Sequence, residues 1–93
     1  MNTKVIYKYG IHDGVNHLPA GEILDYECQS GAFYVWILQW LGEDKKREYK
    51  IDILGTGWEF DEDKSFKMGW HAKTIHSNGF VWHVFCKDCG WVE

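Results

Sequence analysis

The most apolar part of the chain is the stretch from Ala32 to Leu41, which reads AFYVWILQWL. Gln39 is its only polar residue, and most of the others are aromatic or β-branched. The stretch is too short to span a bilayer, and its odd and even positions are both apolar. It therefore predicts a central strand that is covered on both faces, and we assign Trp36 and its neighbours to the core.

Other segments alternate between apolar and polar residues with the period of two that is typical of strands. The expected strands are 4–9, 15–18, 22–29, 47–54, 58–60, 66–73 and 80–85. The first carries two lysines, which favours the edge of a sheet. In 22–29, the side chains of Leu24, Tyr26 and Cys28 are expected to point inward. Ser30-Gly31 then leads into the apolar stretch, which predicts a β-hairpin.

Turn signals such as Asp13-Gly14 and Asn78-Gly79 recur along the chain, and no long stretch has a helical period. We therefore predict an all-β fold, a small antiparallel β-sandwich or partly open barrel of about six to eight strands. A chain of 93 residues is long enough for one core. We expect a single β domain, 1–85, followed by a C-terminal tail, 86–93, that carries a Cys-x-x-Cys motif.

Aromatic residues make up 17% of the chain and include six Trp, which is more than so small a core hides completely. Some indoles are therefore expected at the surface, where they bind a partner protein or stack on a base. The alternative is that they pack across the ends of the fold. The candidates are those at strand ends or beside turns, together with nearby cations for nucleotide capture: Trp40, Trp58, Trp70, Trp91, Arg47, Lys67 and Lys73.

The net charge of -4 argues against general nucleic-acid binding and against binding to an anionic membrane. The basic run 45–47 is flanked by acidic residues that cancel most of its field. We find no apolar run long enough to span a membrane and no leader pattern, so a soluble cytoplasmic protein is expected. Three cysteines, an odd number, favour reduced thiols over a disulfide framework.

Cys86 and Cys89, followed by Gly90, have the pattern of a zinc knuckle. Tetrahedral zinc needs two further ligands, and the candidates are Cys28, His83, His71 and His76. The alternatives are a redox dithiol, two ordinary reduced thiols, or a zinc ion shared between two chains. His83 is interpreted either as a ligand or acid/base group, or as a partly buried histidine bonded to a backbone carbonyl.

Local catalytic motifs are missing from the sequence, which has neither a G-x-S-x-G elbow nor an H-E-x-x-H pair. The acidic segment 59–63 lacks the ligand spacing of a calcium loop and indicates a solvated turn. Gly55-Thr56-Gly57 is not followed by the Lys-Ser/Thr of a phosphate loop and is interpreted as a turn that ends a strand. We therefore expect no enzyme and no cofactor, with zinc as the alternative.

Several short motifs occur together in a characteristic order. They are Tyr7-Lys8-Tyr9, Leu18-Pro19-Ala20-Gly21 with Ile23-Leu24, Trp36, Arg47 before Ile51-x-Ile53, Gly55-Thr56-Gly57, and 81–85. In this respect the chain resembles a family of small uncharacterised tailed-phage proteins from about Lys4 to Phe85. The resemblance implies a soluble protein made by a phage inside a bacterial host, and an accessory rather than a virion component. The tail after Phe85 departs from the family pattern.

These observations lead to one functional expectation with two alternatives. We expect a non-enzymatic phage accessory binding protein that acts in the host cytoplasm and counteracts a host defence by binding a protein or a nucleotide signal. One alternative is a self-associating structural or assembly protein, which makes a homo-oligomer. The other is a zinc-stapled regulator.

Overall fold

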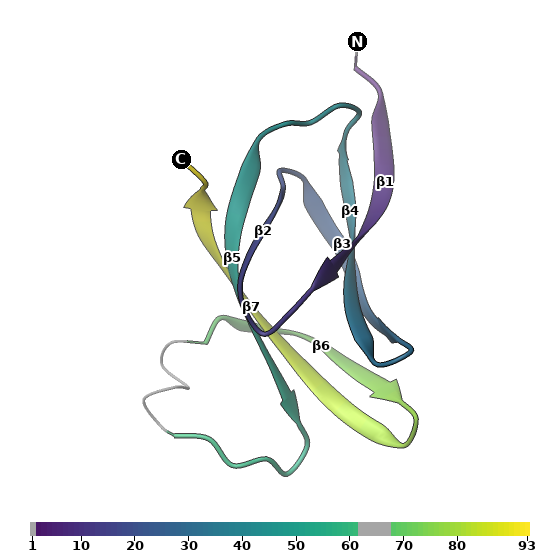
Figure 1. Ribbon diagram of the computed structural model, residues 1–93, viewed down its shortest axis with the longest axis vertical. Helices are drawn as coiled ribbons and strands as arrows, with labels where there is room; N and C mark the ends of the chain where they lie inside the picture. The colour runs from purple at the N-terminus through teal and green to yellow at the C-terminus, as the bar shows by residue number, and fades with distance from the viewer. Residues whose placement is uncertain (1, 62–67) are drawn as a thin grey trace.

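Seven antiparallel strands make up the fold in the computed structural model, which describes residues 2–61 and 68–93 (Figure 1). The strands are β1 (Lys4–Ile11), β2 (Gly14–Pro19), β3 (Glu22–Gln29), β4 (Ala32–Trp40), β5 (Lys46–Gly55), β6 (Trp70–Ser77) and β7 (Phe80–Trp91). The described ranges contain no helical residue, so the predicted all-β class is confirmed. Accordingly, no helix in this part of the chain is long and apolar enough to cross a membrane.

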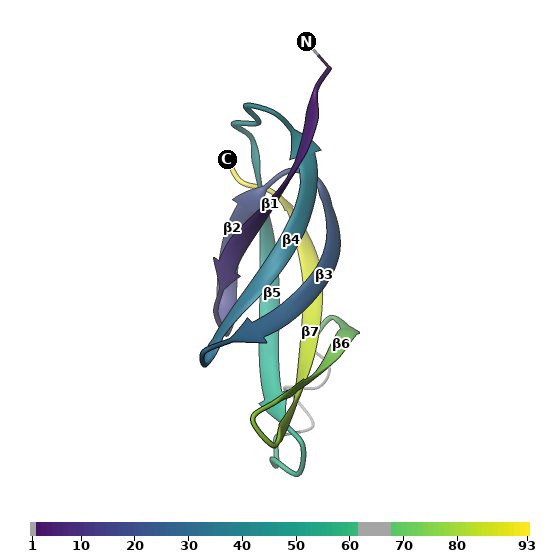
Figure 2. The same cartoon turned by 90° about the vertical axis from the view of Figure 1, so that its right-hand side faces the viewer.

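The strands form two sheets, which we call sheet A, with the order β1-β4-β3, and sheet B, with the order β2-β5-β7-β6. Figure 2 shows sheet A as one layer in front of the long strands β5 and β7 of sheet B. The apolar stretch is thus the central strand of its sheet, and β1 lies at the edge, both as predicted. The predicted hairpin is also present, because β3 pairs with β4 across Ser30 and Gly31, which both have positive φ.

The core lies between the two sheets. Its centre is formed by Val35 and Ile37 of β4 with Ile51 of β5 and Val84 of β7, none more than 1% exposed. The remaining buried members of the cluster are Ile11, Leu18, Tyr26, Tyr49 and Ile75. Each sheet therefore contributes one apolar face to a single core.

The outward face of β4 differs from the prediction. Trp36 is half-buried on this face instead of lying in the core, and Trp40 is 46% exposed. Alternate side chains of a strand point to opposite faces, and sheet B covers only the face that carries Val35 and Ile37. The stretch is apolar at both parities, but only one of its faces is packed into the core.

Lysines of β1 partly cover this outward face. Lys8 Nζ lies 4.7 Å from the ring centroid of Tyr34, and Lys4 Nζ lies 4.8 Å from that of Trp40. The long methylene chain of lysine packs against apolar surface while its ammonium group stays in water. Because each ammonium lies over an aromatic ring, a cation–π attraction also contributes.

β-Bulges explain most of the other differences from the predicted pattern. A register shift between Ile23 and Asp25 leaves Leu24 43% exposed, although it was expected to point inward. A second register shift lies between His71 and Lys73 of β6. This strand begins at Trp70, later than the predicted start at residue 66, and Trp70 is 88% exposed. Residues 58–60 do not form a strand, and Phe66 lies outside the described residues. Each bulge adds one residue and so reverses the inward and outward positions beyond it.

The segment from Cys86 to Trp91 was expected to belong to a separate tail, but it continues β7 without a break. Cys86 pairs with Ile51 of β5, and Trp91 pairs with Arg47. The inward side of β5 at this end carries Tyr49, which is only 6% exposed. Because the end of β7 pairs with β5 here, residues 86–91 are part of the same β domain.

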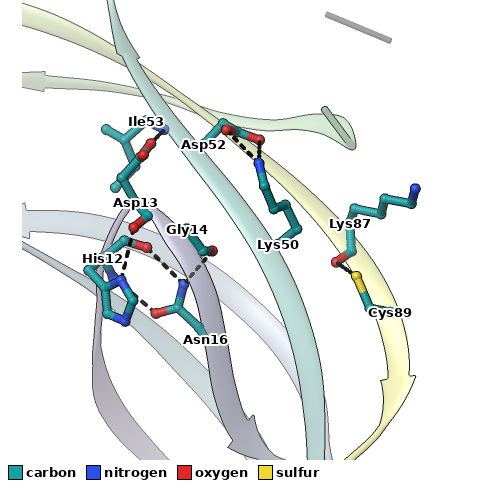
Figure 3. A network of polar contacts seen from close by, with 9 residues as sticks. All are labelled: His12, Asp13, Gly14, Asn16, Lys50, Asp52, Ile53, Lys87 and Cys89. Atoms are coloured by element: carbon teal, nitrogen blue, oxygen red, sulfur yellow. Dashed lines mark hydrogen bonds and ion pairs between the residues drawn. The ribbon is translucent and has the colours of Figure 1, made fainter. Parts of the chain in front are cut away.

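A polar network holds the connection between the two sheets (Figure 3). Asn16, which is 4% exposed, donates from Nδ2 to the carbonyl oxygens of His12 and Gly14 and accepts from the His12 N–H. Asp13 Oδ1 accepts from the N–H of Ile53 at 2.9 Å. The β1–β2 turn is thereby fixed to β5. Nearby, Asp52 lies on the polar side of the alternating segment 47–54 but is only 1% exposed, and Lys50 pairs with it at 2.9 Å.

Two valines of sheet B provide a matched test of this core. We expect Val84→Ala to lower the free energy of unfolding by about 2–3 kcal/mol, because Val84 is fully buried and its loss leaves a cavity. Val15→Ala should cost less than about 1 kcal/mol, because Val15 is 50% exposed. Urea unfolding followed by circular dichroism measures both, and equal losses would contradict the described packing.

Candidate functional site

Two of the four indoles expected at the surface meet at the end of the fold where both termini lie (Figure 1). Trp40 ends β4 in sheet A, and Trp91 ends β7 in sheet B. Both line a cavity of about 270 Å³, which we call the mouth. Its other lining residues are Lys4, Ala20, Gly21, Glu22, Leu38, Gln39 and Glu43.

Trp91 also lines a second, wider hollow of about 600 Å³. The remaining lining residues of this hollow are Asp44, Lys45, Lys46 and Val92. Trp91 is thus shared by two concave surfaces. Its exposed fraction is 58%, so the indole is accessible to a ligand in either of them.

The loop between β4 and β5 carries the chain from sheet A to sheet B at the mouth. It turns at Gly42, whose φ of +78° is accessible to glycine without strain. The carbonyl oxygen of Lys45 accepts from Ala20 N–H at 2.9 Å, and that of Lys46 accepts from Val92 N–H at 3.0 Å. Backbone hydrogen bonds therefore tie this loop both to the β2–β3 turn and to the end of β7.

Arg47 supports the indole of Trp91. Its guanidinium carbon lies 4.5 Å from the Trp91 ring centroid. The same guanidinium donates from Nε and Nη2 to the carboxylate of Asp88, at 3.1 to 3.2 Å. Burial alone raises the pKa of Asp88, but the bonds from Arg47 and from the Gly90 N–H outweigh it and hold this pKa below its ordinary value. Arg47 therefore contacts Trp91 and Asp88 of its own chain, and it helps to position the Trp91 indole.

Trp58 is at the opposite end of the fold from the mouth. Its ring packs edge-on against the ring of Trp82, with the centroids 5.3 Å apart. Phe33 also packs edge-on against Trp82, with the centroids 5.6 Å apart. This arrangement agrees with the alternative that surplus indoles close the ends of the fold. Trp58 nevertheless remains 57% exposed.

The other expected binding residues do not join the mouth. Trp70 lines a separate hollow with Met68, Gly69, Lys87 and Asp88. Lys73 extends to sheet A, where its Nζ pairs with Asp25 at 3.0 Å. Lys67 lies outside the described residues. Of the seven predicted residues, the structure therefore brings together Trp40, Trp91 and Arg47.

The cysteines expected to bind zinc are not brought together. Cys86 and Cys28 pack against the core from β7 and β3, whereas Cys89 is exposed, with its Sγ 3.6 Å from the Lys87 carbonyl oxygen. Burial raises the pKa of the Cys86 thiol, which disfavours the thiolate that binds metal. Within 2–61 and 68–93, no three His, Cys, Asp or Glu residues are grouped so that they hold a metal ion.

His83 belongs to a cluster that the sequence pattern did not indicate. Its Nε2 lies 2.7 Å from the Thr56 hydroxyl, and its Nδ1 lies 3.1 Å from Nε2 of His71. Thr74 Oγ1 is 3.3 Å from the same atom of His71. The partners of His83 are therefore a hydroxyl and a second imidazole, not the expected backbone carbonyl. A hydroxyl beside an imidazole resembles part of a nucleophilic triad, but His71 occupies the place of the orienting carboxylate.

The fold and the mouth define a small two-sheet antiparallel β protein that exposes indoles at one end. Residues 2–90 match a family described as a domain of unknown function, DUF7352, and the chain belongs to this family. The matched range extends past residue 85 and includes both cysteines of the Cys-x-x-Cys motif. No curated protein and no solved structure matches the chain significantly.

The Arg47–Asp88 contact predicts a measurable titration. The pKa of Asp88, followed by carboxyl NMR, should lie below its ordinary value of 3.8 in the wild type. It should rise in Arg47→Gln, because burial still raises this pKa and the guanidinium that lowers it is gone. Since the folded-state pKa is lowered, the stabilisation from Asp88 is present above the unfolded pKa and is lost as the pH falls through the folded value. An unchanged pKa in the variant would contradict the described contact.

Proposed function

We propose that this protein is a non-enzymatic phage accessory binding protein that acts in the host cytoplasm and counteracts a host defence. Its ligand, a host protein or a nucleotide signal, binds at the mouth. The observation that carries this proposal is the meeting of Trp40 and Trp91, exposed by 46% and 58%, at one cavity between the two sheets. The resemblance of the sequence motifs to small tailed-phage proteins supports the phage origin.

The surroundings of the two indoles favour a protein as the ligand. Trp and Arg are the residues that most often anchor protein–protein interfaces, and such anchors are usually surrounded by polar residues that exclude water. Here both signs of charge surround the indoles: Lys4, Lys45, Lys46, Glu22, Glu43 and Asp44. A protein surface that carries both signs is complementary to this rim. A polyanion is a poorer match because it would be repelled by the three acidic groups.

The test compares matched tryptophan variants. Partners are recovered from bacterial host lysate with three tagged proteins: the wild type, the double variant Trp40→Ala/Trp91→Ala, and the single variant Trp70→Ala. Trp70 is the control because it is 88% exposed and does not line the mouth. We expect one host protein to be recovered by the wild type and by the control. The double variant should recover at least about 30-fold less, because truncating an interface anchor typically costs 2 kcal/mol or more.

Two results would contradict this proposal. One is equal recovery of the host protein by the mouth variant and by the wild type. The other is turnover of a nucleotide, a peptide or an ester by the purified protein. The Thr56–His83–His71 contacts make an ester the most informative substrate to include.

A nucleotide is the second candidate, and it is favoured by Lys45 and Lys46 beside the Trp91 indole in the wider hollow. A base stacked on the indole would place its phosphates near these ammonium groups. Titration with mononucleotides and cyclic dinucleotides should shift the indole N–H signal of Trp91 in an NMR spectrum, and Lys45→Glu/Lys46→Glu should weaken binding most at low salt. If the Trp91 signal stays unchanged up to millimolar ligand, this candidate is eliminated.

A further inference from the structure

The outer face of sheet A carries a row of large apolar side chains. We call the outward residues of β4, namely Tyr34, Trp36, Leu38 and Trp40, the outer ladder. Ile6 of β1 pairs with Leu38 and adds to it, with an exposed fraction of 52%. Figure 2 views this face directly, and none of the described strands lies in front of it. An apolar row on a solvent-facing sheet is an unusual surface for a monomer and indicates an interaction site.

Opposite charges flank the ladder on its two sides. On β1, Lys4 and Lys8 pair in register with Trp40 and Trp36. On β3, the acidic residues pair with the same strand from the other side: Glu22 with Leu38, Asp25 with Trp36 and Glu27 with Tyr34. One edge of the face is therefore basic and the other is acidic, with the apolar row between them.

We infer that this face binds the same face of a second copy of the chain, with the two-fold axis parallel to β4. Rotation about that axis places β1 of each copy over β3 of the other, so that Lys8 faces Asp25 and Glu27, and Lys4 faces Glu22. The outer ladders then pack against each other at the centre. A two-fold axis perpendicular to the strands would place lysine over lysine, which like-charge repulsion disfavours.

Glu27 is the acidic group best placed to accept a new partner. Asp25 already pairs with Lys73 at 3.0 Å, whereas Oε1 of Glu27 is buried without a hydrogen-bond partner among the described residues. Because Oε1 is enclosed by its own chain, the contact in the dimer is made through the other carboxylate oxygen, Oε2, which is not among the enclosed atoms. Lys8 at present donates to Gln29 across the ladder at 2.8 Å, so its ammonium group extends over the apolar row. In the dimer, this ammonium group exchanges Gln29 for Glu27 of the second copy.

The size of the face determines how tight this dimer is. Three strands spaced about 4.8 Å apart, with a rise of about 3.4 Å per residue, give a face of roughly 400 Å². Two copies therefore bury on the order of 800–1,000 Å², which is below the roughly 1,600 Å² of a standard stable interface. The expected dimer is weak and concentration-dependent, with a dissociation constant in the micromolar range. The dimer face shares Lys4, Glu22, Leu38 and Trp40 with the mouth. Lys8, Trp36 and Glu27 do not line that cavity, so variants at Lys8 and Glu27 test the dimer separately from ligand binding at the mouth.

A charge-reversal experiment tests both the face and the axis. In sedimentation velocity, the wild type should shift from monomer at about 1 µM to dimer at a few hundred µM. Lys8→Glu should weaken self-association at least about tenfold, because it places acid against Glu27, and Glu27→Lys should do the same by placing lysine against Lys8. An equimolar mixture of the two variants should restore the dimer, since each supplies the charge that the other now needs.

The control is Trp70→Ala, which removes an exposed indole from the other sheet and should dimerise like the wild type. Circular dichroism checks that each charge variant keeps its fold. A wild type that stays monomeric at millimolar concentration would overturn the inference, as would a mixture of the two variants that stays monomeric. A dimer that both single variants leave intact, or a host protein that occupies the face in place of a second copy, would also overturn it.

Discussion

The contact on which the structure most depends is the packing of Val35 and Ile37 against Ile51 and Val84. These side chains are no more than 1% exposed, and they join sheet A to sheet B at the centre of the core. Fully burying each of them contributes about 1.5–3 kcal/mol. Because β4 uses its odd-numbered residues for this contact, its even-numbered residues point away from sheet B. The outer ladder is a consequence of this alternation of side chains along β4, and Trp40 lies at the end of the ladder nearest the mouth.

This dual role of β4 joins the two proposed surfaces. Trp40 ends the outer ladder and also lines the mouth, where it meets Trp91 of the other sheet. The Arg47–Asp88 contact positions Trp91, and backbone bonds from Ala20 and Val92 hold the loop that crosses between the sheets. A partner at the mouth and a second copy on the outer face would therefore contact neighbouring positions of one strand. Binding at one surface is expected to influence the other.

Much of the fold was predictable, because local signals determine where strands begin and end. Alternating residues located most of the strands, and Ser30-Gly31 and Asn78-Gly79 marked their hairpins. The covering of each face was not predictable, because it depends on which faces of a sheet a second sheet packs against, and long-range contacts decide this. Trp36 was placed in the core on the assumption that a doubly apolar strand is doubly covered. Bulges at Leu24 and before Lys73 also reversed the inward positions, and no local residue pattern marked them.

The site was predictable only in part. The position of indoles at strand ends identified Trp40 and Trp91, but their meeting depends on strand order, which follows from long-range pairing of β5 with β7. The Cys-x-x-Cys motif suggested a metal-binding turn. In the structure the motif belongs to the extended strand β7, and Cys86 faces the core. His71 and His83 come together only through the register of β6 with β7.

On these proposals, β4 buries one face in the core and uses the other for interaction. The most direct test is the NMR spectrum of the six indole N–H groups, recorded over a series of protein concentrations. The Trp36 signal should shift as the concentration rises, while the signals of Trp58 and Trp70 should stay constant. A Trp36 signal that does not respond to concentration, or one that is protected from solvent like a core residue at every dilution, would contradict it.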